Sequence, residues 1–79
     1  MYTVYSKSDC PNCQTVKTVM SMNGITFEEK EVGKDITVEE FTSIAPGIRE
    51  MPQVFKGDQR IGGLNDFKAH LIILKAEHN

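Results

Sequence analysis

Alternating apolar and polar residues predict short strands at four places in the chain. The expected strands cover residues 1–5, 25–32, 52–55 and 59–61. The turn Lys56-Gly57-Asp58 separates the last two, and it is short enough to fold them back on each other as an antiparallel hairpin.

Apolar residues at helical spacing fill the intervals between the strands. Val16, Val19 and Met20 fall on one face of a first helix. Pro11 suits the first turn of this helix, where a missing N–H costs nothing, and Asn23-Gly24 suits its end.

Two further helices are predicted, over residues 38–45 and 65–77. Thr37 and Glu40 have the spacing of a capping box at the start of the former, and Pro46-Gly47 ends it. The residues that we expect these helices to bury are Phe41 and Ile44 in the first, and Phe67, Leu71 and Leu74 in the second.

The elements therefore follow the order strand–helix–strand–helix–strand–strand–helix. A helical crossover between the first two strands predicts that they pair in parallel. The pattern predicts an α/β fold, a four-stranded mixed sheet with helices on both faces. Since 79 residues leave room for little more than one core, we expect residues 1–79 to form a single domain.

Charge and composition narrow the expected function. A formal net charge of −2, with no Lys/Arg stripe, argues against a nucleic-acid partner. No apolar run reaches membrane-spanning length, and the start runs straight into the first strand with no space for a signal peptide. We therefore expect a cytoplasmic protein without a membrane partner, in a compartment where paired cysteines are usually catalytic or metal-binding.

The two cysteines, Cys10 and Cys13, are the candidate chemical groups. A disulfide between them would close too short a loop to stabilise the fold much. The start of a helix offers unpaired N–H groups and partial positive charge, and both favour a thiolate over a thiol. A C-x-x-C pair near a strand–helix–strand pattern is typical of a redox centre. A zinc site that adds His70 and His78 lacks the usual ligand spacing, so we expect no metal ligands.

Three segments together make the chain resemble a glutaredoxin of the small dithiol, bacterial or phage type. They are Lys7-Ser8-Asp9-Cys10-Pro11-Asn12-Cys13, Met51-Pro52 and Ile61-Gly62-Gly63-Leu64-Asn65-Asp66. The resemblance covers residues 2–77 and implies the thioredoxin-like fold of that family. It also implies a dithiol–disulfide oxidoreductase that uses glutathione to reduce protein disulfides and glutathione mixed disulfides.

The resemblance assigns roles to individual residues. Cys10 would be the nucleophile and Cys13 the resolving thiol, one helical turn further in. Pro11 and Asn12 would tune the turn between them. Lys7 would lie near the thiolate and the glycyl carboxylate of glutathione, although a solvated surface lysine is the ordinary alternative.

Two more segments would hold the tripeptide. A cis Met51-Pro52 bond would turn the Met51 backbone toward the cysteinyl unit. Gly62, Gly63, Asn65 and Asp66 resemble the γ-glutamyl site, with helix N–H groups for its carboxylate and Asp66 for its ammonium. The alternatives are a plain strand stop at the glycines and a plain N-cap at Asn65 or Asp66.

The remaining expectations concern partners. Glutathione would be a co-substrate, with no tightly bound cofactor. Disulfide-containing proteins would be the partners of a monomer, and the resemblance suggests ribonucleotide reductase among them. Tyr5 could belong to the core or to the rim of the cleft, and we favour the rim.

Three other functions stay open. A glutaredoxin-like hydrogen donor recharged by thioredoxin reductase would not need a γ-glutamyl pocket. An iron–sulfur cluster carrier of this family usually lacks proline at the place of Pro11. An inert interaction module would not need both cysteines.

Overall fold

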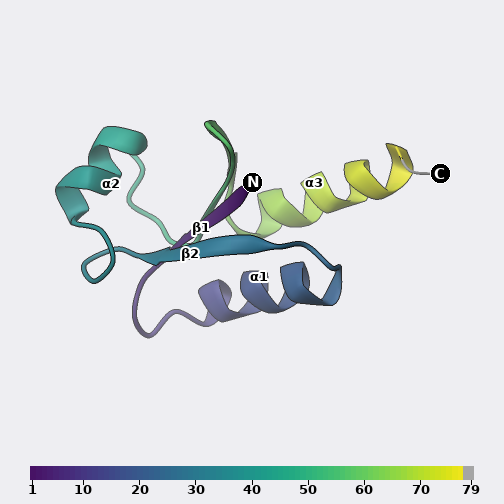
Figure 1. Ribbon diagram of the computed structural model, residues 1–79, viewed down its shortest axis with the longest axis horizontal. Helices are drawn as coiled ribbons and strands as arrows, with labels where there is room; N and C mark the ends of the chain where they lie inside the picture. The colour runs from purple at the N-terminus through teal and green to yellow at the C-terminus, as the bar shows by residue number, and fades with distance from the viewer. Residues whose placement is uncertain (78–79) are drawn as a thin grey trace.

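A computed structural model describes residues 1–77 of the chain (Figure 1). Strand, helix and turn follow in the predicted order. The elements are β1 (Tyr2–Ser6), α1 (Pro11–Met22), β2 (Phe27–Glu31), α2 (Val38–Ile44), β3 (Gln53–Lys56), β4 (Gln59–Gly62) and α3 (Leu64–Glu77). No helix within these residues is both long enough and apolar enough to cross a membrane.

The four strands form one mixed sheet in the order β2-β1-β3-β4. β1 pairs in parallel with β2, with Tyr2 opposite Phe27. It pairs in antiparallel fashion with β3, with Val4 opposite Val54, and β3 pairs in antiparallel fashion with β4. The predicted parallel crossover and antiparallel hairpin are therefore confirmed.

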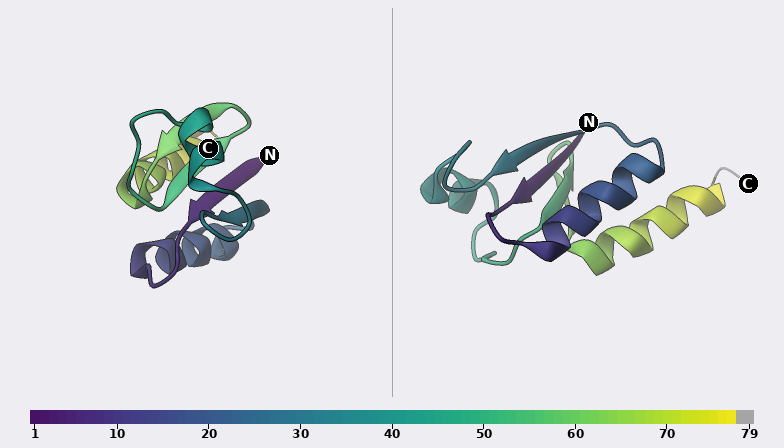
Figure 2. Two further views of the ribbon diagram at one scale, coloured as in Figure 1. Left: turned by 90° about the vertical axis from the view of Figure 1, so that its left-hand side faces the viewer. Right: turned by 90° about the horizontal axis from the view of Figure 1, so that it is seen from below.

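One face of the sheet is covered by α1 and α3, which run side by side (Figure 2, right panel). Fully buried side chains from the sheet and both helices meet there: Val4, Val16, Met20, Val54 and Phe67. Burying a side chain of this size stabilises the fold by about 1.5–3 kcal/mol. This packing holds α1 against the sheet, and Cys10 and Cys13 lie at the start of α1.

The opposite face of the sheet packs against α2. Its buried cluster consists of Tyr5, Phe41, Ala45 and Phe55. Because side chains alternate along β1, Tyr5 points away from the cluster that holds Val4. With 6% of its surface exposed, Tyr5 belongs to the core, so our preference for the cleft rim was wrong.

Two details of the helices differ from expectation. Ile44 is 45% exposed, and Ala45 is the buried residue instead. Ala45 lies four residues after Phe41 and so shares its face, whereas Ile44 is turned aside. Leu74 is half-buried but packs outside the buried clusters.

The expected helix ends are otherwise present. Thr37 accepts a hydrogen bond from the Glu40 N–H, and the Glu40 carboxylate accepts one from the Thr37 N–H, both at 3.0 Å. α1 ends at the cap residue Asn23, followed by Gly24 with a φ of 69°. These caps satisfy backbone groups that would otherwise lack partners.

Candidate active site

A short loop carries the chain from the end of β1 to the redox cysteines. Asp9 adopts a left-handed conformation with a φ of 53°, which aspartate tolerates better than most residues. Cys10 then caps α1 in an extended conformation, and Pro11 is the first helical residue. Cys10 thus lies just before the helix and not within its first turn.

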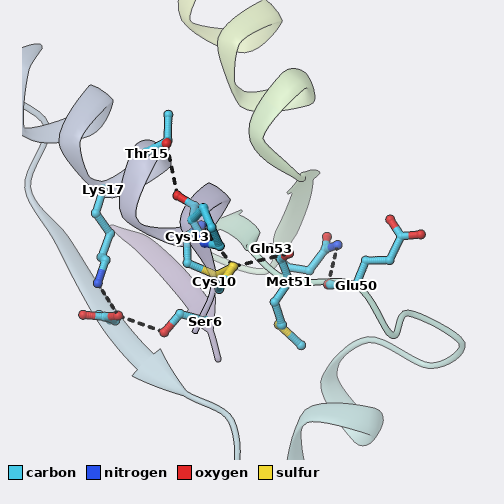
Figure 3. The surroundings of a disulfide bond; sticks show 10 residues. Ser6, Cys10, Cys13, Thr15, Lys17, Glu50, Met51 and Gln53 are labelled. Atoms are coloured by element: carbon cyan, nitrogen blue, oxygen red, sulfur yellow. Dashed lines mark hydrogen bonds and ion pairs between the residues drawn. A yellow bond between two sulfur atoms is a disulfide. The ribbon is translucent and has the colours of Figure 1, made fainter. Parts of the chain in front are cut away.

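Cys10 and Cys13 are joined by a disulfide, with their Cα atoms 5.2 Å apart (Figure 3). The Cys13 N–H donates a hydrogen bond to the Cys10 Sγ at 3.1 Å. Cys10 is 9% exposed, and Cys13 is 1% exposed. Cys10 is therefore the more exposed of the two cysteines. In the reduced protein, the N–H donor and the positive end of α1 favour an ionised sulfur at Cys10.

The peptide bond between Met51 and Pro52 is cis, as expected. It places the Met51 carbonyl oxygen 3.8 Å from the Cys10 Sγ (Figure 3). Pro52 itself is buried, and its carbonyl oxygen lies near Gly63, 3.5 Å from where a β-carbon at Gly63 would stand. The cis-proline loop therefore lies between the disulfide and the start of α3.

A groove of about 740 Å³ runs from the start of α1 past this loop to the start of α3. Six of the predicted glutathione-binding residues line it: Asn12, Met51, Pro52, Gly63, Asn65 and Asp66. Lys7, Pro11 and Gly62 are not among its lining residues. Lys7 and Pro11, next to the cysteines in sequence, are exposed, and Gly62 is buried.

The start of α3 differs from the plain N-cap at Asn65 or Asp66 that was the alternative to a γ-glutamyl site. The Phe67 N–H donates to the Gly63 carbonyl at 2.9 Å, so Gly63 is the residue that caps the helix. The Asp66 Oδ2 accepts a hydrogen bond from the Gly63 N–H at 3.2 Å. Asn65 and Asp66 are helical residues, and a plain N-cap at either of them is wrong.

Gly62 is required by the same arrangement. Its φ is 126°, which L-residues rarely adopt. A β-carbon there would stand 2.7 Å from both Cβ and Cγ of Asp66. The glycine is therefore more than a strand stop, because it leaves room for the Asp66 carboxylate.

The sequence analysis did not predict a series of hydrogen-bonded polar groups in the groove. Gln53 is 4% exposed, and its Nε2 donates to the Glu50 carbonyl at 2.9 Å (Figure 3). Its Oε1 accepts a hydrogen bond from the Arg60 Nη1 at 3.2 Å. Arg49 lines the groove as well, while the Glu50 carboxylate points away from the disulfide. A glutamine within a predicted buried strand was the available signal, because buried polar groups need partners.

A second polar cluster lies where the end of β1, α1 and β2 meet. Ser6, which is 1% exposed, donates its hydroxyl to Glu29 Oε2 at 2.8 Å, and Lys17 Nζ donates to the same oxygen at 2.8 Å (Figure 3). The hydrogen bond from Lys17, with another from Ser6, outweighs partial burial and holds the pKa of Glu29 below its ordinary value of 4.5. The cluster ties α1 to β2 and to the end of β1.

Within residues 1–77, no three candidate ligands come together as a metal site. The His70 Nε2 instead hydrogen-bonds the Tyr2 hydroxyl at 3.0 Å, and its ring packs against Phe67. His78 lies outside the described residues.

Of the two cysteines, Cys10 is the more exposed, and Cys13 is buried and bonded to it as a disulfide. A pair so placed exchanges thiols and disulfides, and the strand order with its cis-proline loop is that of the thioredoxin-like fold. The chain is therefore a thiol–disulfide oxidoreductase of that fold.

Comparison with known proteins identifies the family. The glutaredoxin family profile matches residues 2–61, and the chain belongs to the glutaredoxin family. Escherichia coli glutaredoxin 3 is 32% identical over 84% of this chain and 80% of its own length. A Haemophilus influenzae hybrid peroxiredoxin, hyPrx5, is 33% identical over 85% of this chain. The match spans only 27% of the length of hyPrx5. The family profile ends before Gly62, so it does not cover the start of α3.

Solved structures agree with this assignment. Francisella tularensis glutaredoxin 1 has a TM-score of 0.77 and 26% identity, with 95% of both chains covered. A buckwheat glutaredoxin–glutathione complex has a TM-score of 0.69 and 27% identity, covering 87% of this chain and 66% of that one. The glutaredoxin-like NrdH-redoxin of Escherichia coli, which has a thioredoxin-like activity profile, has a TM-score of 0.66 and 31% identity, covering 82% of this chain and 84% of that one.

Proposed function

We propose that the protein uses glutathione to reduce protein disulfides and glutathione mixed disulfides. The observation that carries this proposal is the groove of about 740 Å³ that joins the Met51 backbone, beside the Cys10 sulfur, to the Asp66 carboxylate at the start of α3. An extended tripeptide with a central thiol and a zwitterionic end suits such a groove. The similarity to a glutaredoxin that forms a glutathione complex supports the same ligand.

The proposed reduction of a protein disulfide has two steps. The Cys10 thiolate attacks one substrate sulfur, a mixed disulfide forms, and the other substrate sulfur leaves as a thiolate that takes up a proton. The Cys13 thiolate then attacks the Cys10 sulfur and releases the second substrate thiolate. The product is the Cys10–Cys13 disulfide, the form that the structure describes.

Two glutathione molecules would restore the dithiol. The thiolate of the first attacks the Cys10 sulfur and frees Cys13 as a thiolate that is then protonated. The second attacks the glutathione sulfur of this mixed disulfide, which leaves Cys10 reduced and glutathione disulfide as the product. A glutathione mixed disulfide of another molecule needs only Cys10, because its glutathione passes to Cys10 and then to a second glutathione.

The groove residues have distinct roles in this proposal. The Met51 backbone pairs with the cysteinyl unit as a short added strand. Asp66, whose Oδ2 already holds the Gly63 N–H, accepts from the γ-glutamyl ammonium. Lys7 faces the glycyl carboxylate from the loop before Cys10, and Pro11 and Asn12 shape the turn between the cysteines.

A second candidate is a hydrogen donor recharged by thioredoxin reductase. The similarity to NrdH-redoxin, with its thioredoxin-like activity profile, favours it. The Gly62, Gly63 and Asp66 arrangement favours glutathione, because a reductase-fed protein needs no pocket for an amino-acid head group. For either candidate, family resemblance suggests a cytoplasmic monomer with ribonucleotide reductase among its substrates.

A coupled assay separates the two candidates. The oxidised protein is offered glutathione with glutathione reductase, or thioredoxin reductase alone, and NADPH consumption is followed with a protein disulfide as the final acceptor. We expect turnover with the glutathione system. Turnover with thioredoxin reductase and none with glutathione would contradict the proposal and support the second candidate.

A further inference from the structure

Arg60 stands out among the charged residues of the groove. It lies on β4 opposite Phe55, and the register places it on the sheet face that Phe55 and Tyr5 share. It lines the same groove as Gly63, Asn65 and Asp66. The two ion pairs formed within residues 1–77 involve Lys17 and Lys30, and Arg60 takes part in neither.

The guanidinium of Arg60 is held in place by a buried partner. Its Nη1 donates to Gln53 Oε1 at 3.2 Å, and Gln53 is 4% exposed. Gln53 is held in turn by the Glu50 carbonyl, to which its Nε2 donates at 2.9 Å (Figure 3). A guanidinium has five N–H donors, so this single bond leaves a preset fork for a carboxylate.

We infer that Arg60, positioned by Gln53, binds the α-carboxylate of the γ-glutamyl unit and so selects glutathione over other thiols. This inference rests on the proposed function. An amino-acid head group carries its ammonium and its carboxylate on one carbon. A site that receives the ammonium at Asp66 therefore needs a donor for the carboxylate close by.

The start of α3 supplies only some of the hydrogen-bond donors that the α-carboxylate requires. The Gly63 N–H already donates to Asp66 Oδ2, so it is not free for a ligand. Arg60 provides a full positive charge in the same groove, and paired N–H donors match a carboxylate in geometry as well as charge. Asp66 and Arg60 together form a complementary pair for a zwitterion.

The test measures single-turnover rates of the reduced protein with three mixed disulfides of 2-mercaptoethanol. One carries glutathione, one carries glutathione amidated at the γ-glutamyl α-carboxylate, and one carries glutathione amidated at the glycyl carboxylate. Arg60→Gln is compared with the parent chain. Lys68→Gln, on an exposed position of α3 outside the groove, is the matched charge control.

We expect Arg60→Gln to slow the reaction of the glutathione and glycyl-amide substrates about tenfold, as for a lost charged hydrogen bond that solvent partly screens. The α-amide substrate should react with both proteins at the same reduced rate. Gln53→Met, which keeps the buried volume, should show a smaller loss with the same dependence on the α-carboxylate. Lys68→Gln should react as the parent does.

Equal losses on all three substrates, no loss on any, or a loss that disappears with the glycyl amide would each overturn the inference. These results leave the proposed function standing, since the parent still reacts with glutathione substrates. If the parent reacts no faster with the glutathione substrate than with the corresponding cysteine mixed disulfide, the proposed function fails, and the inference fails with it.

Discussion

The backbone N–H of Cys13 donates a hydrogen bond of 3.1 Å to the Sγ of Cys10. In the reduced protein, the same N–H would stabilise a thiolate at Cys10, the proposed nucleophile, through the backbone of Cys13 and not its side chain. Substituting the Cys13 side chain should therefore leave the activation of Cys10 largely in place. The two cysteines can be separated by mutation for this reason.

Cys10→Ser should abolish reduction of both protein disulfides and glutathione mixed disulfides, because the proposed nucleophilic sulfur is lost. Cys13→Ser should keep the reaction with glutathione mixed disulfides and lose the reduction of protein disulfides. Both activities are measured with the glutathione-coupled assay. Retained activity in Cys10→Ser, or loss of both activities in Cys13→Ser, would show that the roles are assigned wrongly.

Replacing Asp66 tests the γ-glutamyl contact. Asp66→Asn keeps an oxygen that can accept from the Gly63 N–H but removes the charge that would meet the ligand ammonium. We expect a higher KM for glutathione, from a charged hydrogen bond of about 1.5–3 kcal/mol, at the lower end because Asp66 is exposed. Asp66→Ala should lose stability as well, since the cap is gone. An unchanged KM in Asp66→Asn would remove this carboxylate from the site.

Gly62→Ala tests the packing behind the groove. The alanine must keep a φ of 126°, and its β-carbon must displace the Asp66 side chain. We expect the free energy of unfolding in urea to fall by about 1–3 kcal/mol, with a higher KM for glutathione. Gly57→Ala is the control, because Gly57 has a φ of 59° and open space around it. If both variants change KM equally, the Asp66 contact is not the cause.

The cluster around Glu29 predicts a dependence of stability on pH. The folded-state pKa of Glu29 lies below 4.5, so its contribution is complete above that pH and is lost as pH falls through the folded value. Glu29→Gln should therefore lower the free energy of unfolding at neutral pH by about 0.2–1 kcal/mol, since solvent screens the pair. This difference should disappear in acid. Glu28→Gln, at the neighbouring exposed position with a longer contact of 4.0 Å to Lys30, is the control and should change stability less. A difference for Glu29→Gln that persists at low pH would contradict the account.

The order of elements, the sheet pairing and the position of the cysteines were predictable because each has a local cause. The capping box at Thr37 and Glu40 and the stop at Asn23-Gly24 depend on a few neighbouring residues. The buried face of α2 was predicted only in part. A seven-residue helix leaves the choice between Ile44 and Ala45 to the packing of the sheet, which local spacing does not determine.

The groove could be predicted only where family resemblance supplied the residues. The cis bond at Pro52 is an example, since its ordinary frequency is about 5–6% of such bonds. The link from Arg60 through Gln53 to the Glu50 carbonyl depends on how β3 and β4 pair and on the cis-proline loop. Such long-range register is not visible in the spacing of residues along one segment.

The central claim is that glutathione forms its mixed disulfide with the sulfur of Cys10. Intact-mass spectrometry of the reduced Cys13→Ser and Cys10→Ser proteins, after brief exposure to glutathione disulfide, tests it directly. The account predicts one glutathione on Cys13→Ser, mapped to Cys10, and none on Cys10→Ser. Glutathione on Cys10→Ser alone, or on neither protein, would contradict it.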